Sequence, residues 1–125
     1  MTAHRELEAL QAVVQKVLNE GRLGKPSFAR AFAQAAGGPQ EATAALAAMT
    51  AMANAWFGAD ATVLHAAGGE ETGHMVSLLR WPEGQSAILS VGPGGPGPTR
   101  LDLALLGSRG AVYYRTPEGV GGLSA

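Results

Sequence analysis

The chain has 125 residues, of which 46% are hydrophobic and 15% charged, and its formal net charge is −1. This length and composition are those of one folded domain, and the absence of cysteine excludes disulfides, thiolate metal ligands and cysteine nucleophiles. Nine basic residues stand against ten acidic ones, with no dense basic stretch that would indicate a nucleic-acid surface. We expect a single domain over residues 1–125, with a core of about residues 5–116 and a flexible tail over residues 117–125.

The N-terminus lacks the basic region and apolar core of a secretory signal peptide. No apolar run approaches the ~18 residues that a membrane-spanning helix needs. We therefore expect a cytoplasmic protein.

Two segments have the apolar spacing of helices. The first covers residues 5–20 and is expected to end at Gly21, and the second covers residues 40–57 and is expected to end at Gly58. The second segment is rich in alanine, which favours a helix. The predicted buried positions are Leu7, Leu10, Val13, Val14, Val17 and Leu18 in the first helix, and Ala42, Ala45, Leu46, Met49, Met52, Ala53, Trp56 and Phe57 in the second.

Residues 27–33 lie between the two helices and alternate as a strand does. Phe28, Arg30 and Phe32 share one side of this strand, and alanines occupy the other. Because alanine is small, the alanine side allows a helix to pack closely.

Short predicted strands fill the rest of the chain. A tight turn at Pro82-Glu83-Gly84 predicts an antiparallel hairpin between its two flanking segments. The predicted strands cover residues 62–66, 73–81, 85–92, 100–106 and 111–115.

The order helix, strand, helix and then several strands predicts an α+β domain. Its mainly antiparallel open sheet has two helices packed on one face. In the predicted hairpin, Val76, Leu78 and Ile88 share one face, and the opposite face is equally apolar. Both faces of the sheet are apolar, but the two helices can cover only one of them. The sequence therefore predicts that a second copy of the chain covers the other face in a homodimer. The opposite face carries Met75, Leu79, Ala87, Leu89 and Val91.

Three stretches carry a resemblance to a known family. They are residues 18–26 (LNEGRLGKP), residues 53–58 (ANAWFG, followed by Val63 and His65-Ala66), and residues 79–85 (LRWPEGQ) with residues 103–112 (LALLGSRGAV). In this order and spacing they resemble the C-terminal α/β domain of the Gfo/Idh/MocA oxidoreductases, which are NAD(P)-dependent sugar and polyol dehydrogenases. The resemblance implies the same open-sheet fold.

The departures from this family bear on function. Its enzymes begin with a Rossmann domain and use the lysine of a Glu-Lys-Pro motif. Here no such domain precedes the matched segment, and Lys25-Pro26 comes too late to supply that lysine. The resemblance also implies an aspartate, a glycine and then a His-x-x-Asp motif on the second helix, at places that fall among Ala44, Ala45, Ala48 and Ala51. Alanine cannot transfer a proton, so we expect no catalysis by the chain on its own.

Nine residues are candidates for a ligand or interface site, with no catalytic, cofactor-binding or metal-binding residue among them. Arg30 is a cation between two phenylalanines, and Met49, Met52 and Trp56 would line a cleft between the second helix and the sheet. His65 and His74 flank a loop with Glu70 and Glu71, but their spacing is not that of a zinc site. The full set is Arg30, Met49, Met52, Trp56, His65, His74, Leu79, Leu89 and Tyr113.

Other features are expected to be structural. The loop 92–98 is too rich in proline for a nucleotide loop and precedes a strand rather than a helix, so we predict no bound dinucleotide. Arg100 and Asp102, with Arg109 in the following turn, would form a surface ion pair. Tyr113 and Tyr114 would place one ring on each face of the last strand, one in the core and the other at a subunit interface.

These observations leave three hypotheses open. The first is a catalytically silent relative of the oxidoreductase C-domain that forms homodimers through the open sheet face. The second is an accessory subunit of a split NAD(P)-dependent dehydrogenase, in which a separate Rossmann-type partner supplies the cofactor. The third is a small-molecule binding protein that uses the cleft beside the second helix.

Overall fold

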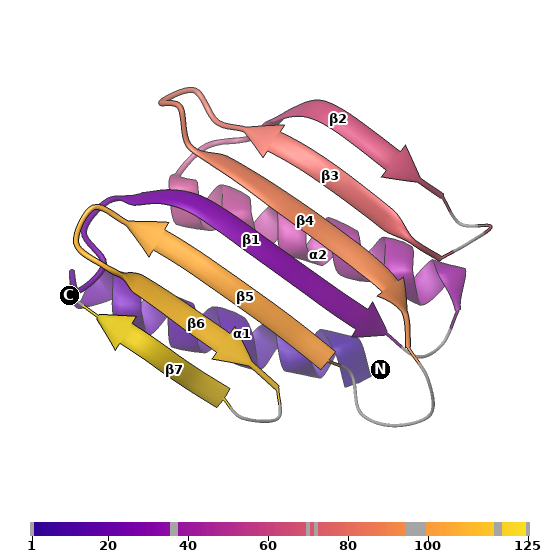
Figure 1. Cartoon of the computed structure of the whole chain (residues 1–125), viewed down its shortest axis with the longest axis horizontal. Coiled ribbons are helices and arrows are strands. Elements are labelled where there is room, and N and C mark those ends of the chain that lie inside the picture. The colour runs from indigo at the N-terminus through magenta and orange to yellow at the C-terminus, as the bar shows by residue number, and fades with distance from the viewer. Residues whose placement is uncertain are drawn as a thin grey trace.

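Two helices cover one face of a seven-stranded sheet in the part of the chain that the structure describes (Figure 1). This computed structural model describes residues 2–35, 38–69, 71, 73–94, 100–116 and 119–124. The elements are α1 (Thr2–Asn19), β1 (Pro26–Ala35), α2 (Pro39–Phe57), β2 (Thr62–Gly68), β3 (Met75–Arg80), β4 (Ser86–Pro93), β5 (Arg100–Gly107), β6 (Ala111–Arg115) and β7 (Gly119–Ser124).

The strands lie in the order β2-β3-β4-β1-β5-β6-β7, so the first strand of the chain takes the centre of the sheet. It runs parallel to β4 and antiparallel to β5, and all other neighbouring strands are antiparallel. The predicted α+β class, with a mainly antiparallel open sheet and both helices on one face, is confirmed. The central position of β1 was not predicted, because strands 62–115 read as one continuous meander.

Side-chain size explains why β1 can lie at the centre. Ala29, Ala31 and Ala33 point to the helix side and are buried, and α2 packs over them. Phe28 and Phe32 point to the opposite face, as the alternation predicted. A strand with small residues on one side brings a helix close enough to exclude water from the sheet.

Both helices bury the apolar stripes that their spacing predicted. On α1 the deepest residues are Leu7, Leu10, Val14 and Val17. Helix α2 begins with a proline in its first turn and ends at Gly58, whose φ of 78° is the left-handed conformation that stops a helix.

Polar contacts attach the end of α2 to the β3–β4 hairpin. The indole N–H of Trp81 donates to the carbonyl of Ala59 at 2.9 Å and to Oδ1 of Asn54 at 3.0 Å. The Asn54 oxygen also accepts from the backbone N–H of Ala61 at 3.1 Å. The rings of Trp81 and Phe57 lie 4.5 Å apart. Residues 53–58 and 79–85, two of the segments that resemble the dehydrogenase family, therefore hold the end of α2 against the β3–β4 hairpin.

The C-terminal segment differs from the prediction of a flexible tail. Residues Gly119–Ser124 form β7, which pairs antiparallel with β6 at the edge of the sheet. Glycine gives this segment no alternating pattern in the sequence, and its pairing with β6 defines the strand. Residues 117, 118 and 125 lie outside the described part of the chain.

Two turns interlock at one end of the sheet. The carbonyl of Leu23 accepts from the N–H of Arg109 at 3.0 Å, and Lys25 and Ser108 exchange two hydrogen bonds of 2.9 Å. Gly107 faces the Leu23 carbonyl so closely that a methyl group there would overlap the oxygen.

We expect Gly107→Ala to destabilise the domain by about 2–4 kcal/mol, because the added carbon must push the two turns apart. Chemical denaturation at neutral pH measures this loss. Gly69→Ala is the matched control, since a Cβ at Gly69 meets nothing within 4 Å, and it should change the free energy of unfolding by less than about 0.5 kcal/mol. Equal stability of the two variants would contradict this account of the joint.

Candidate interaction surface

The sheet face opposite the helices consists of three rows of side chains that run across the strands, and together these rows define the open face. The strand registers place Arg30 at the middle of the central row and Phe28 and Phe32 in the rows on either side. The central row is His65, Leu78, Ile88, Arg30, Ala104 and Tyr113. The flanking rows are Ala67, Val76, Ser90, Phe32, Asp102 and Arg115, and Thr62, Arg80, Ser86, Phe28, Leu106 and Ala111.

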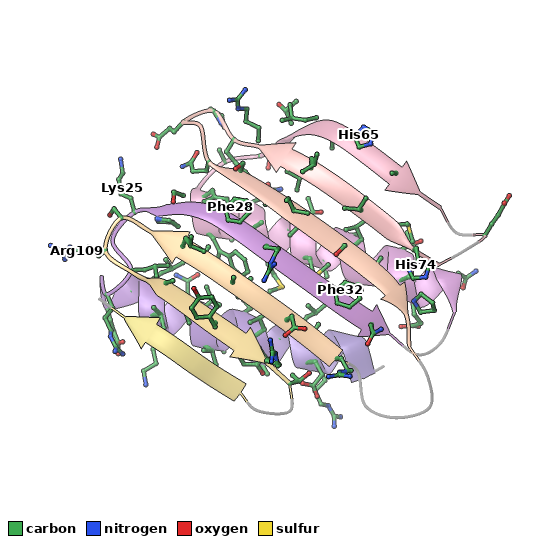
Figure 2. All side chains as sticks on the ribbon, in the orientation of Figure 1. Lys25, Phe28, Phe32, His65, His74 and Arg109 are labelled. Carbon is green, nitrogen blue, oxygen red and sulfur yellow. The ribbon has the colours of Figure 1, made fainter. Side chains whose placement is uncertain are left out.

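Apolar side chains occupy much of the open face. Leu78 and Leu106 are each 37% exposed and Tyr113 is 47% exposed. Phe28, Phe32, Val76 and Ile88 are half-buried around them. Figure 2 shows Phe28 and Phe32 on this side of β1, with no helix over them. An antiparallel sheet with one wet face normally carries polar residues there, so this face has the composition of a contact surface.

Charge is concentrated near the centre of the same face. Arg30 is exposed, and its side chain makes no hydrogen bond or ion pair with the residues that the structure describes. Asp102 lies on the adjacent strand β5, one row away, where its Oδ1 accepts from Nε of Arg115 at 2.7 Å. The sequence predicted a surface ion pair for Asp102, and the structure gives it Arg115 as partner.

The two candidate histidines lie on the open face but not together. His65 lies along β2 and His74 immediately before β3, close to Phe32 (Figure 2). Among the described residues there is no group of three or more side chains suited to hold a metal ion. Glu70, one of the two predicted loop carboxylates, lies outside the described residues.

A shallow hollow lies beside His74. Its volume is about 280 Å³, and Phe32, Val76 and Ser90 line it with His74. Gly92 leaves room for these rings, since a Cβ there would approach the His74 imidazole to 3.2 Å and the Phe32 ring to 3.7 Å. The hollow continues the open face at one corner.

Five candidate residues belong to the core instead of a surface site. The sequence placed Met49, Met52 and Trp56 along a cleft, but Met49 and Trp56 are buried beneath α2 and Met52 packs against the same core. The indole N–H of Trp56 donates to Oε1 of Gln11 on α1 at 2.7 Å, which joins the two helices. Leu79 and Leu89 are 1% and 0% exposed on the helix side of the sheet. These positions are filled by helix packing, so they cannot contribute to the open face.

The adjacent tyrosines divide between the two faces as predicted. Tyr113 is exposed on the open face, and Tyr114 is buried on the helix side. Burial, together with the negative charge of Glu6 on α1, raises the pKa of the Tyr114 phenol above its ordinary value of 10.0.

The alanines that replace the expected catalytic positions all lie on α2. Ala45 is buried, Ala48 is half-buried, and Ala44 and Ala51 are exposed. The glycine-proline loop is described only at its start, where Gly92 and Pro93 end β4, and residues 95–99 lie outside the described part. The segment after this loop is β5, the strand that the sequence predicted.

Alternation along the strands would have located more of the open face than the candidate residues did. Ile88, Leu106 and Phe32 belong to it but were absent from the predicted site. These residues could have been found from the face that they share. Assigning that face requires the register of β1 with β4 and β5, and the sequence did not show that β1 lies between these strands.

Comparisons with known proteins bear on the fold. The domain is similar to the WlbA dehydrogenase from Bordetella pertussis, with a TM-score of 0.68 and 15% identity over 90% of this chain and 42% of that chain. It is similar to a probable dehydrogenase from Thermotoga maritima, with a TM-score of 0.69 and 16% identity over 98% of this chain and 45% of the other. For the scyllo-inositol dehydrogenase from Lactobacillus casei the TM-score is 0.64 and the identity 12%, over 91% of this chain and 44% of that one.

The resemblance drawn from the sequence is thereby confirmed at the level of the fold, which is that of the C-terminal domain of Gfo/Idh/MocA-type dehydrogenases. The chain spans less than half the length of each of these dehydrogenases. No family model matches the sequence, and no curated protein does. Within the described residues, no helix combines the length and apolar character needed to cross a membrane.

Because the pKa of Tyr114 is higher in the folded than in the unfolded chain, its stabilising contribution is complete below pH 10.0 and is lost as pH rises through the folded pKa. We expect the wild-type free energy of unfolding to fall above pH 10, by up to about 1.4 kcal/mol per pH unit from this one proton. Urea unfolding across this range should show a smaller fall for Tyr114→Phe. A Tyr114→Phe curve parallel to wild type would contradict the assignment.

Proposed function

We propose that this domain is a dimerisation module whose partner is a second copy of the chain, bound through the open face, and that it has no catalytic chemistry of its own. The observation that carries this proposal is the apolar character of both faces of the sheet, combined with the presence of both helices on one of them. Leu78, Leu106 and Tyr113 would lose their contact with water in such a dimer. Burial of this surface is the source of the binding energy.

The size of the open face supports the proposal. Seven strands about 4.8 Å apart, with three rows of side chains, give a surface of roughly 30 Å by 20 Å. This projected area of about 600 Å² is of the same order as the ~800 Å² of accessible surface that a specific interface commonly buries on each partner, because accessible surface follows the relief of the side chains and exceeds its projection. Two sheets that pack face to face lie about 10 Å apart, with interdigitated side chains, and Phe28, Phe32 and Ile88 are large enough to fill that space.

The chemistry of α2 supports a role without catalysis. The helix is 19 residues long, and its only acidic residue is Glu41 in the first turn. Ala44, Ala48 and Ala51 occupy positions at which the family resemblance implies aspartate or histidine. A methyl group neither accepts nor donates a proton, so this helix can pack against the sheet but cannot take part in hydride-linked proton transfer.

Sedimentation velocity of the purified protein at micromolar concentrations tests the proposal. We expect wild type to sediment with the mass of two chains. The double variant Leu78→Asp/Tyr113→Asp should sediment with the mass of one, because it places charges within the apolar surface. Circular dichroism should show that the variant retains its secondary structure, since both side chains are exposed.

The control variant is Ala47→Asp/Ala51→Asp, which makes the same number of changes to aspartate at exposed positions on α2. This variant should remain a dimer. Wild-type protein that sediments as a single chain across the concentration range would overturn the proposed function. Loss of the dimer in the α2 control would assign the interface to the helices instead.

A further inference from the structure

The seven strands carry very few charges, and these are unevenly distributed. In the strands that the structure describes, Asp102 is the only acidic residue, whereas four residues are arginines. These are Arg30, Arg80, Arg100 and Arg115. Arg80 is the last residue of β3 and Arg100 the first of β5, so both lie at the rim of the open face. Arg30 lies on the central strand and in the central row, between Phe28 and Phe32.

Covering the open face would remove Arg30 from water. A buried guanidinium is strongly unfavourable unless a carboxylate or several hydrogen-bond acceptors receive its N–H groups. The residues described in this chain provide its side chain with no such partner. The covering surface must therefore bring an acidic group to the centre of the face.

A second copy brings one such group from its strands, and that group is Asp102. Arg30 is paired with Ala104 and Asp102 with Phe32 across β1 and β5, so Arg30 and Asp102 are diagonal neighbours about 7–8 Å apart. In a two-fold dimer of stacked sheets the axis lies between the sheets and parallel to them. An axis that passes between Arg30 and Asp102 exchanges the two positions, so each arginine meets the aspartate of the other copy.

We infer that reciprocal ion pairs between Arg30 of each copy and Asp102 of the other set the register of the dimer, an inference that rests on the proposed function. Asp102 can accept from Arg30 of the other copy while it keeps its bond to Arg115, because a carboxylate has two oxygens with about four acceptor sites. The three charges then form one network at the centre of the interface, surrounded by Phe28, Phe32 and Ala104. Arg80 and Arg100 remain in solvent at the rim.

Charge reversal in the two partners separately tests the pairing. Arg30→Glu gives a chain with an acid at both positions 30 and 102, and Asp102→Arg gives a chain with an arginine at both positions. Each variant alone should dimerise at least about 30-fold more weakly than wild type, because like charges would face each other. A 1:1 mixture should form a heterodimer, since residue 30 of each copy then faces the opposite charge at residue 102 of the other. Sedimentation velocity with a fluorescent label on one variant measures both results.

The double variant Arg30→Glu/Asp102→Arg should dimerise with itself, because the exchange restores both pairs. Lys16→Glu and Asp60→Arg make the same charge changes at exposed positions outside the strands and should leave dimerisation unchanged. Circular dichroism confirms that each variant is folded.

The outcomes separate the inference from the proposal beneath it. A monomeric wild type overturns the proposed function. If wild type is a dimer and both single variants dimerise as well as wild type does, the proposed dimerisation stands but the reciprocal ion pairs are wrong. Variants that fail to dimerise alone and also fail when mixed overturn the reciprocal pairs too.

Discussion

The placement of β1 at the centre of the sheet is the constraint on which the rest of the structure depends. Its alanines allow α2 to approach the sheet closely, and its Phe28, Arg30 and Phe32 define the middle of the opposite face. One strand therefore determines both the helix-covered core and the character of the open face. The parallel pairing with β4 and antiparallel pairing with β5 bring two separate antiparallel sets of strands into one sheet.

The polar contacts of the core hold the fold together. This structural role explains why residues 53–58 and 79–85 resemble the dehydrogenase family. Asn54 and Ala59 receive the indole N–H of Trp81, and Gln11 receives that of Trp56. Each bond satisfies a buried donor and joins two elements that are distant in the chain. These residues maintain the fold that the domain shares with the dehydrogenases. They do not require the chemistry of those enzymes, so the same scaffold can carry a different function.

In the proposed dimer, the open face would give specific binding to a domain with few charged residues. Apolar side chains supply non-directional attraction, which alone permits many relative orientations. A small number of charges within such a surface restricts the orientation, because any arrangement that buries a charge without its opposite is unfavourable. In the proposed dimer, Arg30 and Asp102 would provide this restriction with one residue of each sign.

The sequence by itself determined the two helices, the six strands before residue 117, and which residues of β1 and of the β3–β4 hairpin share a face. It could do so because local spacing and residue size control these features. The division of Tyr113 and Tyr114 between the two faces was predictable for the same reason. Local patterns also indicated that both faces of the β3–β4 hairpin are apolar, and they gave the bounds of the sixth strand, Ala111–Arg115, as the structure has them.

Only the tertiary structure decided which segments are neighbours. The position of β1 between β4 and β5, the pairing of β7 by backbone hydrogen bonds and the ion pair of Asp102 with Arg115 depend on contacts between distant residues. The same contacts moved Met49, Trp56, Leu79 and Leu89 from a predicted site into the core. Apolar spacing shows that a residue is buried, but whether a helix, a strand or another molecule covers it is determined by the packing of the whole chain.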